Sequence, residues 1–232
     1  MSGRLAVPYP RLLATATLAA AGAAIAGALL AREASGWWWL HWVGKPLATV
    51  LILALAWRAR PASSPRYRRW ILAGIACSLA GDVLLMLPGD LFVPGLVAFL
   101  FAHACFIAAF LGDSRFAAPA WPLVACLAWG AANLALLWNA IDAPLRVPVI
   151  VYVAVLCSMG GQAVVRAWRG DASARLAARG ALVFMLSDGV LAWDRFRGPV
   201  PLASLWVLAA YYLALWWIAR SVQGVPVEHE AA

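Results

Sequence analysis

The sequence predicts an all-α protein: a polytopic membrane bundle of about eight transmembrane helices with both termini in the cytoplasm. Of its 232 residues, 65% are hydrophobic and only 12% are charged. Soluble domains carry about 25% charged residues, so this composition excludes a soluble fold. The chain also contains eight apolar runs close to the length that a helix needs to cross the hydrocarbon core, about 20 residues. We therefore expect an integral, multi-pass protein of a bacterial inner (plasma) membrane.

Each predicted helix is an apolar run bounded by residues that interrupt helices. The runs extend, in order, over residues 12–30, 38–57, 68–87, 92–111, 120–138, 146–166, 177–194 and 202–220. The first begins beside Arg11 and is longer than the apolar part of a typical signal peptide, which favours a membrane span. The breaks between later runs contain Pro, Gly, Ser or Asp, as turns and loops do, and lie at residues 61–65, 88–90, 119, 142–144, 170–171 and 197–199. Several of the 14 Trp residues lie beside these helix ends, as in the aromatic belts of membrane interfaces.

The distribution of basic residues predicts the orientation of the bundle. Thirteen of the 18 Lys and Arg residues lie in the N-terminal segment, the second, fourth and sixth loops and the C-terminal tail. Basic loops stay on the cytoplasmic side, so that side is predicted to hold both termini. We expect residues 1–223 to form a single transmembrane helical domain and residues 224–232 to form a short, disordered cytoplasmic tail.

The net charge of +8 does not indicate binding to nucleic acid. Nearly all of it comes from Arg residues in loops between apolar runs, where they set orientation and meet anionic lipid head groups. We therefore expect membrane lipids and no nucleic acid as partners, and the sequence carries no signal for an oligomeric state. The four Cys residues lie in separate runs, without the spacing of zinc sites or disulfide frameworks. We interpret them as small apolar side chains.

Two acidic residues inside apolar runs are the strongest functional signal. Asp82 lies in the third run and Asp188 in the seventh, and each follows a glycine by eight residues, Gly74 and Gly180 respectively. An ionisable side chain at membrane depth is costly and marks a functional site by default. The third and seventh runs share one direction. At 1.5 Å per residue, both carboxyl groups lie roughly 8 to 9 Å below the outer boundary.

Other polar side chains fall at neighbouring depths in separate runs. The same arithmetic places Lys45 about 10 Å below the outer surface, in the second run. Asn133 and Tyr152 lie at a similar level in the fifth and sixth runs, and a deeper set comprises His103, Tyr211 and Tyr212. We take this layer to be a candidate site in which Asp82 and Asp188 are catalytic and the others support them or bind substrate.

Simpler interpretations exist for each member of this layer. Asn133, Tyr152 and the two adjacent tyrosines could be ordinary interhelical hydrogen-bonding groups, and Asp82 with Lys45 could be a structural ion pair. His103 alone in an apolar helix is more often a buried core residue than a ligand. A mixed Asp/Asp/His zinc site is a weaker alternative, because catalytic zinc takes three protein ligands and few histidines are suitably placed. We predict no metal and no cofactor.

The order and spacing of several motifs resemble the YhhN-type lysoplasmalogenase family. They are Gly81-Asp82-Val83-Leu84-Leu85-Met86, Phe92-Val93-Pro94-Gly95-Leu96-Val97-Ala98-Phe99, Ala102-His103, Gly180-Ala181-Leu182-Val183-Phe184-Met185-Leu186-Ser187-Asp188, Tyr211-Tyr212 and, earlier, Lys45-Pro46. The resemblance covers roughly residues 79–213.

The resemblance implies a membrane ether hydrolase that cleaves the vinyl ether bond of lysoplasmalogens to a fatty aldehyde and a glycerophospho-base. Asp82 and Asp188 are the implied catalytic acids, with Lys45, His103 and Tyr211 as supporting groups. This chain departs from the family at two positions: Phe106 stands where a tyrosine is frequent, and Leu215 where a glutamine is frequent. The implied substrate is a lysophospholipid.

Two carboxyl groups in different protonation states would suit this chemistry, as in glycosidases and aspartic dyads. One would protonate the alkene and the other would activate water or stabilise the cation; the residues leave their assignment open. Arg195 and Arg197 follow Asp188 and could attract the lipid phosphate, or they could be ordinary interfacial arginines. The main alternative function is a proton- or cation-coupled transporter that uses the same acids, and a non-catalytic lipid-binding protein is the third.

Overall fold

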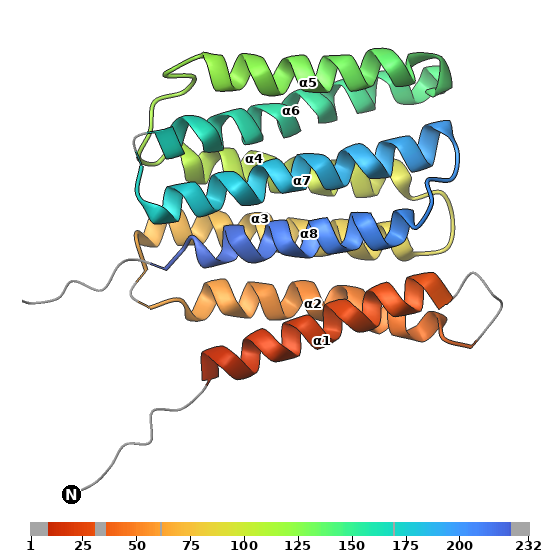
Figure 1. The fold of residues 1–232 in the computed structure, drawn as a ribbon, viewed down its shortest axis with the longest axis horizontal. Coiled ribbons are helices and arrows are strands. Elements are labelled where there is room, and N and C mark those ends of the chain that lie inside the picture. Colours follow the sequence, from red (N-terminus) through yellow and green to blue (C-terminus); the bar gives the residue numbers. More distant parts are fainter. Residues whose placement is uncertain (1–8, 31–35, 61, 169, 224–232) are drawn as a thin grey trace, which may run out of the picture.

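The computed structural model describes residues 9–30, 36–60, 62–168 and 170–223. Within these residues the chain forms eight α-helices and no β-strand (Figure 1). The helices are α1 (Tyr9–Leu30), α2 (Trp38–Arg58), α3 (Pro65–Met86), α4 (Phe92–Phe110), α5 (Trp121–Leu137), α6 (Ala143–Trp168), α7 (Ala172–Arg197) and α8 (Ala203–Arg220), with a 3-10 turn, η2 (Trp138–Ala140), after α5. The tail predicted over residues 224–232 lies outside the described residues.

All eight helices are long and apolar enough to cross a membrane, which confirms the predicted polytopic all-α class. Consecutive helices run in opposite directions, so α1 begins and α8 ends at the same end of the bundle (Figure 1). We call this the terminal end. The opposite end, on the right in Figure 1, carries the α3–α4 and α7–α8 connections, and we call it the site end.

Helices α6 and α7 are longer than the apolar runs predicted for them. Both α6 and α7 have 26 residues, which corresponds to about 39 Å, whereas the hydrocarbon core is about 30 Å thick. Polar residues therefore occupy their ends outside the core. The α7 helix begins one turn earlier than predicted because the Asp171 side chain accepts a 2.8 Å hydrogen bond from the backbone N–H of Ala174. Similarly, Pro65 does not end a loop but starts α3, after the N-cap Ser64.

The two helices that carry the aspartates pack closely against their successors in the chain. A Cβ atom at Gly180 would lie 2.8 Å from the carbonyl oxygen of Ala214, so α7 and α8 approach backbone to backbone there. At Gly81, directly before Asp82, a Cβ would lie 2.6 Å from the ring of Phe99 on α4. Helices α1 and α5 form the outer edges of the bundle (Figure 1) and are the least buried.

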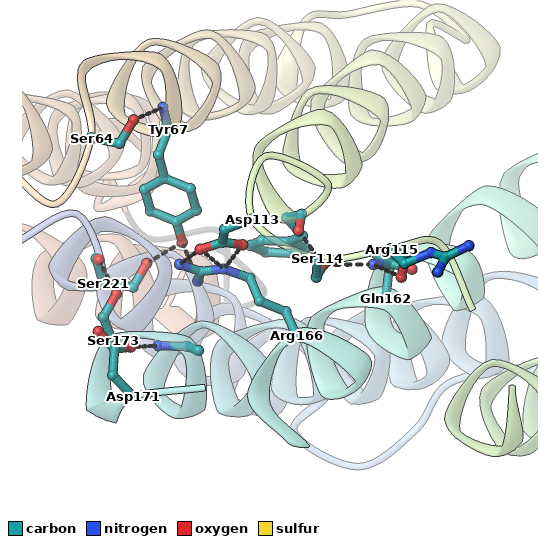
Figure 2. A network of polar contacts seen from close by, with 12 residues as sticks. Ser64, Tyr67, Asp113, Ser114, Arg115, Gln162, Arg166, Asp171, Ser173 and Ser221 are labelled. Carbon is teal, nitrogen blue, oxygen red and sulfur yellow. Dashed lines mark hydrogen bonds and ion pairs between the residues drawn. The ribbon is translucent and has the colours of Figure 1, made fainter. Parts of the chain in front are cut away.

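A polar network that the sequence did not predict joins several helices at the terminal end (Figure 2). The Arg166 guanidinium on α6 donates to both oxygens of Asp113, at 2.7 Å from Nε to Oδ1 and 2.8 Å from Nη2 to Oδ2. It also lies 4.5 Å from the ring centroid of Tyr67 on α3, whose hydroxyl is 2.7 Å from that of Ser221. Gln162, one turn before Arg166, accepts from the backbone of Ala117 at 3.1 Å. This network therefore fastens α3, α6 and the end of α8 to the α4–α5 connection.

Candidate active site

Asp82 is almost fully buried, at 1% exposed, and one of its two oxygens accepts two hydrogen bonds. Its Oδ2 accepts hydrogen bonds from the hydroxyls of Thr49 and Tyr211, both at 2.7 Å. The ammonium of Lys45 lies 3.4 Å from its Oδ1. Lys45 and Thr49 are four residues apart on α2, so one helix face presents both side chains to α3. Helices α2, α3 and α8 thus assemble a carboxyl group with one cation and two hydroxyls.

Asp188 has different surroundings. It is half-buried on α7, and among the described residues its hydrogen-bond partner is the hydroxyl of Tyr152 on α6. A Cβ on the next residue, Gly189, would meet the ring of Trp129 at 3.0 Å. Helix α6 therefore contacts Asp188 directly, and α5 packs against the neighbouring Gly189.

One cavity contains both carboxyl groups. Its polar lining includes Asp82, Asp188 and Lys45, and the remaining wall is mostly aliphatic and aromatic, with contributions from every helix from α2 to α8. The empty space among the lining residues, including the open mouth, is about 1130 Å³. An apolar pocket with a few converging polar groups is the default candidate for an active site.

The structure brings together six of the eight predicted site residues. Asp82, Asp188, Lys45, Asn133, Tyr152 and Tyr211 all line the cavity. Asn133 is oriented by two hydrogen bonds: its amide donates to the backbone of Trp129 at 2.9 Å, and its carbonyl oxygen accepts from the Trp193 indole at 3.0 Å.

His103 and Tyr212 lie behind the cavity wall and not in its lining. His103 is completely buried, and neither ring nitrogen has a hydrogen-bond partner in the described part of the chain. Its ring packs edge-on against Tyr152 at 5.3 Å and Phe184 at 4.8 Å between centroids. Tyr212 packs against Tyr211, and its hydroxyl is likewise unpartnered. Both residues thus pack against the tyrosines that contact the two aspartates, and neither lines this cavity.

The arrangement does not assemble the mixed zinc site considered as an alternative. His103 is its required third ligand, and it does not line the cavity that holds Asp82 and Asp188. Over the described ranges, no three His, Cys, Asp or Glu side chains are grouped closely enough to hold a metal ion.

Sequence reasoning missed Thr49, although it makes one of the two shortest contacts to Asp82. A threonine in an apolar helix ordinarily bonds to its own backbone, and Thr49 does so as well, to the carbonyl of Lys45 at 3.4 Å. The available signal was its position one turn after Lys45, on the same helix face.

Comparison with known proteins agrees with the resemblance of the motifs. The pattern of the YhhN family matches residues 40–222. Lysoplasmalogenase TMEM86B of Homo sapiens is 35% identical over 189 residues, which cover 82% of this chain and 78% of that protein. A lysoplasmalogenase of Mycobacterium bovis is 36% identical over 213 residues, covering 82% and 77%. The uncharacterized membrane protein YhhN of Escherichia coli O157:H7 is 29% identical over 193 residues, covering 79% and 88%. No solved structure matches the chain significantly. The extent of the family match, which includes both aspartates and Lys45, shows that this chain belongs to the YhhN family.

Proposed function

We propose that this protein is a lysoplasmalogenase, which hydrolyses the vinyl ether bond of a lysoplasmalogen to a fatty aldehyde and a glycerophospho-base. The observation that carries the proposal is the pair of carboxyl groups with unlike surroundings on one apolar cavity. The relatives named lysoplasmalogenase support the same substrate class. An apolar cavity inside the bundle suits the alkenyl chain of such a lipid.

The different surroundings of the two carboxyl groups support a division of roles between them. A carboxyl group with a cation and two hydroxyl donors is stabilised as the anion, so Asp82 is the carboxylate. Asp188 accepts from one tyrosine and faces apolar side chains, and burial without a counter-charge favours the neutral acid. Asp188 is therefore the general acid, and Asp82 is the base and the stabiliser of positive charge.

Each step of the reaction then has a named group. Asp188 transfers its proton to the alkene carbon farther from the ether oxygen, which leaves an oxocarbenium ion at the other carbon. Asp82 takes a proton from a water molecule as that water attacks the cation, and a hemiacetal forms. In the collapse, Asp188 recovers a proton from the hemiacetal hydroxyl while Asp82 returns its proton to the departing glycerol oxygen. The aldehyde and the glycerophospho-base leave, and both residues regain their starting states.

The arginine distribution supports an orientation in which the site end of the bundle lies away from the cytoplasm. In a bacterial inner membrane that end faces the periplasm. The lipid would then enter with its head group at the outer leaflet and its alkenyl chain directed into the cavity.

Aldehyde release by purified protein tests the proposal. Wild type, Asp82→Asn and Asp188→Asn are compared on lysoplasmenyl-ethanolamine in detergent, with Asp142→Asn, an exposed acid outside the cavity, as the matched control. We expect both cavity variants to lose at least about 1,000-fold in kcat, as loss of a general acid or base combined with electrostatic stabilisation implies, and the control to match wild type. Unchanged turnover in both cavity variants would overturn the mechanism. Absence of vinyl ether turnover in wild type, with ion flux in proteoliposomes that both cavity variants abolish, would support a transporter instead.

A further inference from the structure

The cavity that holds the carboxyl groups continues into a second, more polar cavity at the site end. The two share seven lining residues, among them Lys45, Phe92 and Arg195. The second cavity is also lined by His41, Asp90 and Asp194. A ligand that enters the apolar cavity from this end therefore leaves its other end among charged groups.

Arg195 is the positive group at this junction, and it is held loosely. Its Nη2 lies 3.5 Å from Oδ1 of Asp90, and its guanidinium carbon lies 5.0 Å from the ring centroid of Phe92. The Arg195 side chain is 46% exposed and that of Asp90 is 80% exposed. An exposed pair at this distance contributes little stability, so either partner can exchange the other for a ligand of opposite charge.

The neighbouring Arg197 differs from Arg195 in its contacts and in its position relative to the two cavities. It donates to the carbonyl of Leu136 at 3.2 Å and lies over the ring of Trp193 at 6.0 Å. It lines neither cavity. The structure therefore separates two arginines that the sequence presented as equivalent.

Other residues that line the polar cavity suit an ammonium group. Trp38 and Trp42 both line this cavity, and their rings stand nearly perpendicular, at 87° with centroids 6.0 Å apart. Perpendicular aromatic faces attract ammonium groups through cation–π interactions. Asp194 adds a carboxylate, which is oriented by a 2.9 Å hydrogen bond from the backbone N–H of Val200.

We propose that this polar cavity binds the zwitterionic head group of a glycerophospho-base lipid, with Arg195 on the phosphate and the Trp38–Trp42 corner, together with Asp90 and Asp194, around the ammonium. The inference rests on the proposed function, because the head group would bind in the polar cavity while the vinyl ether bond of the same lipid lies beside the two carboxyl groups. It also assigns specificity to residues outside the catalytic pair.

The phosphate contact is tested with two arginine variants and two substrates. Arg195→Met is compared with Arg197→Met on lysoplasmenyl-choline and on a 1-alkenyl glycerol, which lacks the phosphate, with concentrations expressed as mole fraction in mixed micelles. We expect Arg195→Met to raise KM for the phospholipid about tenfold or more, since a charge-assisted hydrogen bond is lost. Its KM for the alkenyl glycerol should stay within twofold, and Arg197→Met should match wild type on both. Equal losses on both substrates, or equal effects of both variants, would overturn the assignment.

The ammonium contact is tested in the same way. Trp42→Leu is compared with Trp57→Leu, a variant of an exposed Trp near the opposite end of α2. The substrates are lysoplasmenyl-choline and an alkenyl glycerophosphate without a base. We expect Trp42→Leu to lower kcat/KM severalfold for the choline lipid and to leave the base-free lipid unchanged. A matching loss on both lipids would contradict recognition of the ammonium.

Binding of a lipid that cannot react separates this inference from the proposed function. A 1-O-alkyl-glycerophosphocholine has no alkene, and its affinity for wild type, Arg195→Met and Arg197→Met can be measured by quenching of Trp fluorescence. Selective weakening in Arg195→Met supports the head-group site even if wild type hydrolyses no vinyl ether. Equal affinity of all three proteins refutes the site even if hydrolysis is confirmed.

Discussion

Replacing Lys45 by Met tests whether the charge beside Asp82 controls the chemistry. The ammonium and the carboxylate are 3.4 Å apart, with side chains 10% and 1% exposed. At an effective dielectric constant of about 20, that separation corresponds to an attraction of about 5 kcal/mol. Burial of both groups costs part of this energy, so we expect a net coupling of about 2–3 kcal/mol.

A double-mutant cycle measures that coupling. Unfolding free energies are determined in mixed micelles for wild type, Lys45→Met, Asp82→Asn and the double variant, with Arg58→Met on the exposed end of α2 as the control. Each single variant leaves one buried group without its partner, whereas the double variant leaves none, so the double variant should lose less than the sum of the singles. Additivity within about 0.5 kcal/mol would show that the two groups do not interact.

Kinetics of Lys45→Met then distinguish two roles, because Lys45 also lines the polar cavity. If it acts through Asp82, loss of about 2.7 kcal/mol of stabilisation lowers kcat about 100-fold, and KM for lysoplasmenyl-choline changes little. A raised KM with an unchanged kcat would refute this reasoning, since it would mean that Lys45 acts on the lipid phosphate and not through Asp82.

Three further variants test the frame around the site. Tyr152→Phe keeps the ring that packs against its neighbours but removes the hydroxyl that donates to Asp188. We expect kcat for the vinyl ether lipid to fall about 100-fold, with unchanged thermal stability. Asp113→Ala leaves the Arg166 guanidinium, which is 6% exposed, without its bidentate partner. Because Asp113 itself is 57% exposed, we expect a moderate loss of about 1–3 kcal/mol in chemical unfolding, and a loss below 0.5 kcal/mol would show that the pair is only a surface contact. Gly180→Ala forces a methyl group against the backbone of α8 and should lower the unfolding midpoint; Gly22→Ala, where nothing lies within 4 Å, should keep or raise it. Equal midpoints in the two glycine variants would contradict the close helix packing.

The position of a side chain along its helix could be predicted from the sequence, but the direction in which it points around the helix axis could not. Residue spacing fixes the height of a side chain at 1.5 Å per residue, so Lys45, Asp82 and Tyr211 were placed in one layer. The same arithmetic placed His103 in that layer, but packing rotates α4 so that its imidazole lies behind the Tyr152 ring. Rotation depends on neighbouring helices, which composition and spacing do not reveal.

Contacts between residues far apart in the chain could not be predicted from the sequence either. Arg166 resembles an ordinary basic residue at the end of an apolar run, and its partner Asp113 is 53 residues away in a connecting loop. The contact between the Thr49 hydroxyl and Asp82 was not predicted either. Threonine is common in membrane helices, where it bonds to its own backbone or to a neighbouring helix, so its presence did not indicate a site. Hydropathy, in contrast, predicted all eight helices because lipid requires every backbone group in the core to be satisfied within its own segment.

The two aspartate stretches look like copies in sequence, but what packs against them makes them chemically unequal. Both follow a glycine that lets the next helix approach, so the pattern records how each helix packs and not what its carboxyl group contacts. Helix α2 brings a cation and a hydroxyl to Asp82, whereas α6 brings a phenol to Asp188. Without α2, each of the two acids would have one tyrosine hydroxyl as its partner. The proposed roles of one as acid and the other as base would then have no structural basis. The family match agrees with this reasoning because it begins at residue 40, within α2 and before Lys45, and leaves out α1. Helix α1 contributes no residue to the lining of the first cavity and one, Ala28, to that of the second.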